Sequence, residues 1–195
     1  MEKVMYLANT SLINRFSRIV ALVSVLIISI SASAGSVDYR LPKHVIPTYQ
    51  HIDLTLNPDL DDYSGKTSIS IEVKKETQKI GLYWVGLTVN SIELVGKDNR
   101  VRKLTAKSAD YDIHWLSDGK SVKPGKYQLN LTFDAKYSTD ALGLYKTNYQ
   151  GKNYLFTQFE ALLGRRAFPL FDEPDFKFPY QMTLTVPKHM EVAAN

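Results

Sequence analysis

Residues Thr67–Val73 read TSISIEV, in which polar side chains alternate with isoleucine and valine. Successive side chains of an extended strand point to opposite faces, so this stretch predicts a β-strand with one apolar and one polar face. The same two-residue period recurs in His51–Leu56 and Tyr127–Phe133. Strands of this kind indicate a sheet that is buried on one side and solvated on the other.

Shorter segments on both sides of these strands continue the pattern. Turn-forming residues separate them, as at Asn57-Pro58, Ser64-Gly65 and Pro124-Gly125. Further strands are expected over residues 79–84, 89–95, 101–107, 109–116, 142–149, 153–159 and 180–186, and a short helical turn over residues 161–171. The spacing predicts an all-β fold, an antiparallel β-sandwich or a curved, saddle-like sheet, in one domain over residues 35–195.

The N-terminus has the features of a secretory signal peptide. Arg15 and Arg18 precede the apolar run Ile19–Ile30, and an Ala-x-Ala cleavage pattern ends at Ala34. As a helix, a run of this length spans roughly 18 Å, well short of the ~30 Å hydrocarbon core of a bilayer. We therefore expect residues 1–34 to be a signal peptide, no stable membrane span after cleavage, and a periplasmic or extracellular location.

The composition is that of an ordinary globular domain. Hydrophobic residues make up 44% and charged residues 23% of the chain, so a disordered chain is not expected. The formal net charge of +4 is modest, and no basic run interleaved with aromatic residues predicts a nucleic-acid partner. The absence of cysteine excludes a disulfide framework, a thiol nucleophile and cysteine-based metal sites.

Functional residues concentrate in Thr157–Pro174, which reads TQFEALLGRRAFPLFDEP. On a strand, Gln158 and Glu160 would project from one face, and Thr157 and Phe159 from the other. Taken by themselves, these polar residues could serve as a ligand contact or simply be solvent-exposed strand residues.

Thr157–Pro174 closely resembles the end of the N-terminal domain in the aminopeptidase N family of zinc metallopeptidases, the gluzincin aminopeptidases. The resemblance continues in Leu41-Pro42, Pro47–Tyr49, Gly143–Tyr145 and Phe176–Pro187, and so covers about residues 40 to 195. It implies a substrate-binding role for Gln158 and Glu160. In the family, the matching carboxylate binds the free α-amino group of the peptide, and the matching amide contacts the N-terminal residue.

The resemblance also implies a zinc ion in the full-length enzyme, but not in this chain. The family binds zinc through His-Glu-x-x-His and a downstream Glu, and holds the substrate with a Gly-x-Met-Glu-Asn loop. Neither motif occurs in the sequence, and its histidines (His44, His51, His114 and His189) are scattered singly. A catalytic zinc site needs three protein ligands. We therefore expect no catalytic residue, no metal site and no activity from this chain alone.

Four charged residues of the motif invite two interpretations: Arg165, Arg166, Asp172 and Glu173. They could bind an anionic ligand or form a structural network that holds the turn. The second is favoured because paired arginines and carboxylates give fixed geometry. The segment 161–164 departs from the family pattern with two leucines, which affects the expected specificity pocket more than the amino-group anchor.

Two functions follow from the sequence. The first is the substrate-anchoring N-terminal domain of an exported zinc aminopeptidase that removes N-terminal residues from peptides, present here as a fragment or short form. The second is a free-standing secreted β-sandwich module that binds peptide or glycan without catalysis.

Overall fold

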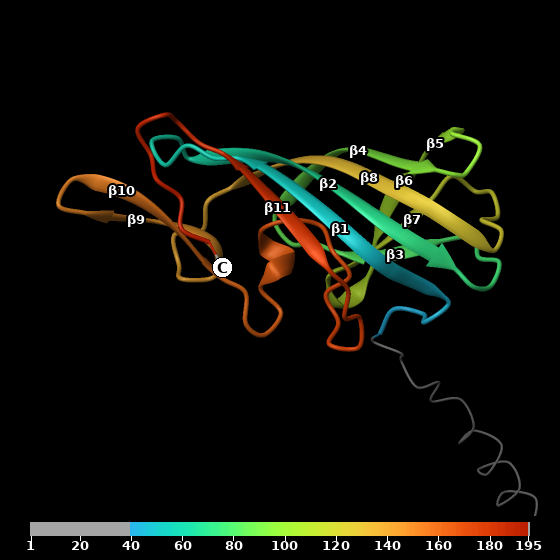
Figure 1. The fold of residues 1–195 in the computed structure, drawn as a ribbon. Coiled ribbons are helices and arrows are strands. Elements are labelled where there is room, and N and C mark those ends of the chain that lie inside the picture. The colour runs from blue at the N-terminus through green and yellow to red at the C-terminus, as the bar shows by residue number, and fades with distance from the viewer. Residues whose placement is uncertain (1–39, 195) are drawn as a thin grey trace, which may run out of the picture. The chain divides into compact units, whose positions relative to one another are not determined.

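The largest element of the fold is a sheet of six strands in the order β11-β1-β2-β8-β4-β5 (Figure 1). The computed structural model describes residues 40–194, and the predicted signal peptide lies outside them. The strands are β1 (Val45–Thr55), β2 (Asp62–Val73), β4 (Leu87–Val95), β5 (Val101–Lys103), β8 (Gly125–Lys136) and β11 (Tyr180–Thr185). The predicted all-β fold is thus confirmed.

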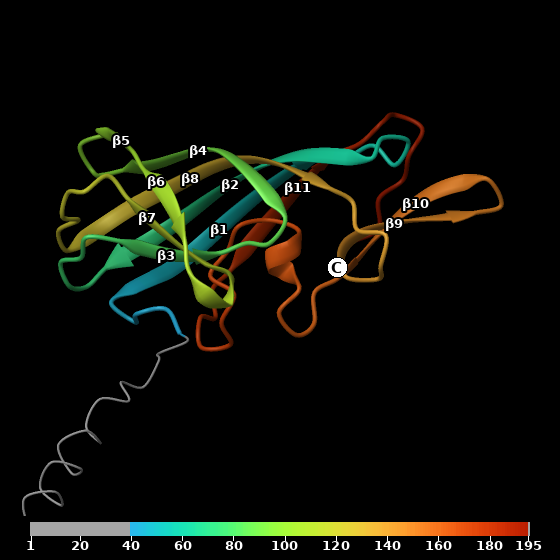
Figure 2. The ribbon, with the colours of Figure 1, turned by 180° about the vertical axis from the view of Figure 1, so that it is seen from behind.

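A smaller three-stranded sheet, in the order β3-β7-β6, packs against one end of the main sheet (Figures 1 and 2). Its strands are β3 (Ile80–Tyr83), β6 (Thr105–Ser108) and β7 (Ile113–Ser117). A separate hairpin, β9 (Gly143–Tyr149) and β10 (Lys152–Gln158), extends away from both sheets. Two short 3-10 turns, η1 (Asp110–Asp112) and η2 (Gly164–Arg166), complete the described elements.

The alternation in β2 determines which face of the main sheet is buried. Its odd-numbered residues from Tyr63 to Val73 are all buried, and the residues between them are half-buried or exposed. Toward one end this face packs with the smaller sheet, where Ile69 and Ile71 share a core with Leu82 and Leu116. Toward the other end it packs with the segment around η2; this second cluster includes Ile52, Leu54, Tyr63, Phe133, Ala167 and Phe168. The buried face of the main sheet is therefore covered by the smaller sheet at one end and by the segment around η2 at the other.

Every strand pair is antiparallel within residues 40–194 except β1 and β11, which run parallel. Ile52 lies opposite Met182 and Leu54 opposite Leu184, so the apolar alternation of the two strands is in register. The C-terminal strand thereby returns to the first strand. This brings the segment after η2 close to the start of the domain.

Two expected strands are shorter than the sequence pattern indicates. The segment 101–107 is split at Leu104, whose side chain is buried and where the chain passes from β5 in the main sheet to β6 in the smaller sheet. The segment 109–116 begins with η1, because Tyr111 and Asp112 have positive φ angles of 62° and 63°, which a strand does not allow. The strand β7 starts only at Ile113.

The turn expected at Ser64-Gly65 is wrong, because both residues lie inside β2. Gly65 is opposite Phe133 in β8, and a Cβ built on it would lie 2.4 Å from Cζ of that ring. The glycine therefore makes room for a buried aromatic ring rather than a turn. No helix within residues 40–194 is long and apolar enough to cross a bilayer.

Candidate functional site

The strand β10 ends at Gln158, which pairs with Gly143 at the base of the hairpin. Glu160 follows after the strand has ended, so strand alternation places only Gln158 and not Glu160. Both side chains are exposed. Between them, Phe159 is half-buried and its ring packs edge-on against Phe168, with centroids 5.6 Å apart. Anchoring Phe159 in the core leaves its two polar neighbours facing solvent.

The polar groups of Gln158 and Glu160 are available to a ligand. Neither side chain forms a hydrogen bond or an ion pair with another residue of the described part of the chain. A carboxylate without a cationic neighbour has no internal charge to offset it, so an ammonium group from outside could pair with it.

A hollow of about 640 Å³ is lined by Phe159 and Ala161, the sequence neighbours of Glu160, but neither Gln158 nor Glu160 lines it. Its walls are mostly apolar and come from β1, β11 and the segment between residues 159 and 178. Residues 161–164, which differ from the family pattern, contain two leucines. Leu162 lines the hollow and is 47% exposed, whereas Leu163 does not line it. The residues that flank Glu160 in sequence therefore line an apolar hollow, which suits the side chain of a hydrophobic ligand.

Arg165 is the centre of the charged cluster that follows. Arg165 is only 8% exposed, and its Nε donates to Oδ2 of Asp172 at 2.8 Å. Its Nη2 donates to the backbone oxygen of Asp172 at 3.2 Å, and its Nη1 to Oδ2 of Asp112 at 3.4 Å. The guanidinium also lies 4.2 Å from the centre of the Tyr83 ring. These contacts tie the segment after β10 to the smaller sheet and to η1.

Glu173 contacts the hydroxyl group of Tyr83. Its Oε1 accepts hydrogen bonds from the Tyr83 hydroxyl, at 2.8 Å, and from the backbone nitrogen of Leu41. Its Oε2 is buried and has no hydrogen-bond partner among residues 40–194. Burial and the hydrogen bond to Glu173 raise the pKa of Tyr83.

Arg166 differs from the other three charged residues of the motif. Its side chain is exposed and forms no ion pair with a described carboxylate. The pairing expected of both arginines is made by Arg165 alone. The contributions of Tyr83 and Asp112 were not foreseen, because these residues are far from the motif in sequence and no local pattern indicates them.

The described residues do not form a zinc site. No group of three or more His, Asp or Glu side chains among residues 40–194 lies close enough to hold a metal ion. The His114 ring stacks on Trp84 with centroids 3.6 Å apart, and its Nε2 lies 3.0 Å from the backbone oxygen of Trp84. Burial lowers the pKa of His114. The His51 ring contacts Thr183 at 2.9 Å.

A model of the Peptidase M1 N-terminal domain matches residues 46–195. The chain belongs to this family. Curated relatives agree, and 80% of the chain aligns with a puromycin-sensitive aminopeptidase from Caenorhabditis elegans at 30% identity and with an aminopeptidase N from Acetobacter pasteurianus at 29%. A glutamyl aminopeptidase from Sus scrofa is 29% identical over 81% of the chain.

The resemblance to the aminopeptidase N family is thus confirmed as membership in the family of the M1 N-terminal domain. The chain spans much less than the length of these relatives: 17% of the Caenorhabditis enzyme, 44% of the Acetobacter enzyme and 18% of the Sus enzyme. The match concerns one domain of proteins that are named for a peptidase activity.

Proposed function

We propose that the chain supplies the substrate-anchoring N-terminal domain of an exported zinc aminopeptidase, which removes N-terminal residues from peptides. In this proposal the Glu160 carboxylate pairs with the free α-amino group of the peptide, and the Gln158 amide contacts the N-terminal residue. The observation that carries it is the exposure of both side chains at and just after the end of β10, with no internal partner.

The chemistry of this pair favours a free amino terminus. A carboxylate and an ammonium form a charge-assisted hydrogen bond that is about twice as strong as a neutral one. A blocked terminus has no charge to offer and leaves the carboxylate unpaired. A site built around such a pair therefore discriminates strongly against blocked peptides.

The zinc ion is part of the proposal only because the family to which the chain belongs consists of zinc aminopeptidases. When bound, it would activate a water molecule for peptide hydrolysis. Since the described residues provide no site for it, the ligands and the general base would lie on sequence outside them. The chain alone should then neither bind zinc stoichiometrically nor hydrolyse aminoacyl substrates. One tightly held zinc per chain, with turnover abolished by a chelator, would disprove this.

The anchoring role can be tested by joining the chain to the catalytic portion of a relative such as the Acetobacter aminopeptidase N. Glu160→Gln and Gln158→Ala should each lower kcat/KM for a peptide with a free amino end. Glu76→Gln, which removes an exposed carboxylate elsewhere, is the matched control and should leave kcat/KM unchanged. Equal kinetics for Glu160→Gln and Glu76→Gln would contradict the proposal.

The second candidate is a free-standing secreted module that binds peptide or glycan without catalysis. It is favoured by the aromatic face of the hairpin, where Tyr149, Tyr154 and Phe156 are 64%, 41% and 49% exposed. An exposed apolar surface of this kind is typical of an interaction site. This candidate predicts that the chain alone binds unmodified peptides or glycans as tightly as the joined protein does. The anchoring proposal predicts that affinity for peptides appears only after joining.

A further inference from the structure

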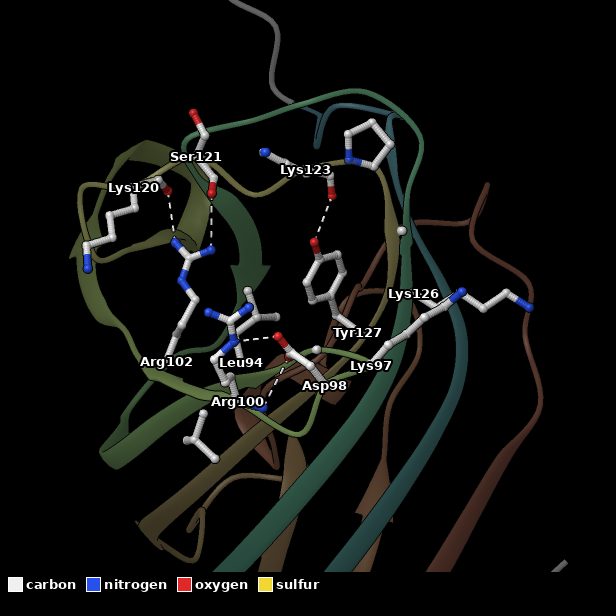
Figure 3. A pocket seen from close by; sticks show the side chains of 14 residues that line it. Leu94, Lys97, Asp98, Arg100, Arg102, Lys120, Ser121, Lys123, Lys126 and Tyr127 are labelled. Carbon is white, nitrogen blue, oxygen red and sulfur yellow. Dashed lines mark hydrogen bonds and ion pairs between the residues drawn. The ribbon is translucent and has the colours of Figure 1, made fainter.

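A basic hollow of about 780 Å³ lies where the turn between β4 and β5 meets the start of β8 (Figure 3). The turn after β4, the loop before β8 and the first residues of β8 contribute its walls. The charged and aromatic side chains that line it are Lys97, Asp98, Arg100, Arg102, Lys120, Lys123, Lys126 and Tyr127. None of these residues belongs to the motif Thr157–Pro174. The hollow is therefore a surface separate from the proposed substrate anchor.

The positive charge of the chain is concentrated here. The lining holds six cationic side chains and one carboxylate, and a second carboxylate, Asp118, pairs with Arg102, so cations exceed carboxylates by four here; the whole chain has 24 Lys and Arg against 20 Asp and Glu. Outside the lining, cations and carboxylates are thus nearly balanced. A local excess of positive charge attracts anions. The rest of the chain is nearly neutral and so does not cancel this attraction.

Arg102 fixes the shape of the hollow. Its Nε donates to Oδ2 of Asp118 at 2.9 Å, and its Nη1 and Nη2 donate to the backbone oxygens of Ser121 and Lys120 at 3.1 and 3.0 Å. The Tyr127 hydroxyl donates to the backbone oxygen of Lys123 at 2.9 Å. These bonds hold the loop before β8 against β5 and β8. These hydrogen bonds fix the backbone of the loop that carries Lys120 and Lys123.

Three lysines provide the charge that is free to act on a partner. Lys97, Lys120 and Lys123 are exposed and form no ion pair among the described residues, whereas Lys126, also exposed, lies directly opposite Glu72 of β2. By contrast, Arg102 is paired with Asp118, and Arg100 with Asp98. Figure 3 shows Lys123 reaching over the opening, while Lys120 and Lys126 point outward on opposite sides. Diverging ammonium groups do not converge on one small anion, but they suit a partner with anionic groups spaced along its length.

We propose that this basic hollow, defined by Lys97, Arg100, Lys120, Lys123, Lys126 and Tyr127, binds a linear acidic polysaccharide. A concave surface accommodates a polymer strand better than a flat bilayer. Single-stranded nucleic acid is less suited, because its binding sites use several aromatic side chains as stacking platforms, and the lining here contains only Tyr127. The exposed aromatic residues of the described chain, such as Tyr149 and Phe156, lie on the hairpin instead.

Binding can be measured with the full chain and fluorescently labelled polygalacturonate, with uncharged dextran and an oligothymidylate as comparison probes. The test variant is Lys120→Glu with Lys123→Glu. The matched control is Lys107→Glu with Lys152→Glu, which makes the same charge change at exposed lysines outside the hollow. Thermal melts of both variants should equal that of the wild type, since all four side chains are exposed.

We expect salt-sensitive binding to polygalacturonate, about tenfold weaker in the test variant and within about twofold of wild type in the control. A tenfold loss corresponds to 1.4 kcal/mol, or about 0.7 kcal/mol per lysine, which lies within the range for exposed charge pairs. Equal losses in both variants would mean that binding follows net charge alone and would overturn the proposal. Absence of binding to polygalacturonate, or tighter binding to the oligothymidylate, would overturn it as well.

Discussion

Replacing Arg165 by alanine should strongly destabilise the domain. The Arg165 side chain is 9% exposed and that of Asp172 is 15% exposed, so the pair is largely out of solvent. The substitution removes both hydrogen bonds to Asp172 and leaves its carboxylate without a cation. Breaking a buried ion pair by removing one partner costs about 3–5 kcal/mol. We expect the lower end, about 3 kcal/mol, because the pair retains some exposure and the contact to Asp112, which is 50% exposed, adds little.

The free energy of unfolding can be measured by urea denaturation of the full chain, followed by the fluorescence of Trp84 and Trp115. Arg166→Ala is the matched control, and it should change stability by no more than ~0.5 kcal/mol because its side chain is exposed. Replacing both members of the pair, Arg165→Met with Asp172→Leu, should recover much of the loss, since no buried charge remains unpaired. A loss below about 1 kcal/mol for Arg165→Ala, or equal losses at both arginines, would refute this reasoning.

Three further predictions concern other parts of the chain. Gly65→Ala should cost roughly 1–3 kcal/mol in a urea titration, because the new Cβ collides with the buried Phe133 ring. Arg102 lowers the pKa of Asp118 to about 2 from an ordinary value of 3.8, so the pair stabilises the fold above pH 4 and this contribution is lost as the pH falls toward 2. Asp118→Asn should therefore lower stability at neutral pH and reduce its decline over that interval; an unchanged acid profile would argue against the pair. N-terminal sequencing of exported protein should show cleavage of the Ala34–Gly35 bond, and an intact Met1 on membrane-bound material would contradict it.

Much of the fold could be predicted because it depends on local alternation. The alternation in TSISIEV places the four buried side chains of this stretch of β2, those of Thr67, Ile69, Ile71 and Val73, and similar patterns locate β1 and β8. The pairing of β1 with β11 could not be predicted, because it joins Gln50 to Tyr180 across most of the domain and no local pattern specifies a parallel neighbour. Gly65 was misread for a related reason: the ring that requires its small size lies on another strand.

The candidate site was only partly accessible from sequence. The motif singled out Gln158 and Glu160, and the structure places both in solvent at the base of the hairpin. Strand alternation does not account for Glu160, because β10 ends at Gln158 and the anchoring of Phe159 determines which side chains face outward. The partners of Arg165 come from distant segments, so the charged cluster emerges only after folding.

The central claim, that Glu160 pairs with the amino end of a peptide, can be tested most directly by a double-mutant cycle in the joined protein. Wild type and Glu160→Gln are compared on an aminoacyl substrate and on its analogue that lacks the α-amino group. For the amino substrate, the substitution should lower kcat/KM by roughly 30- to 700-fold, equivalent to about 2–4 kcal/mol. For the analogue it should have almost no effect. Equal losses on both substrates, or no loss on either, would show that the carboxylate does not bind the amino group.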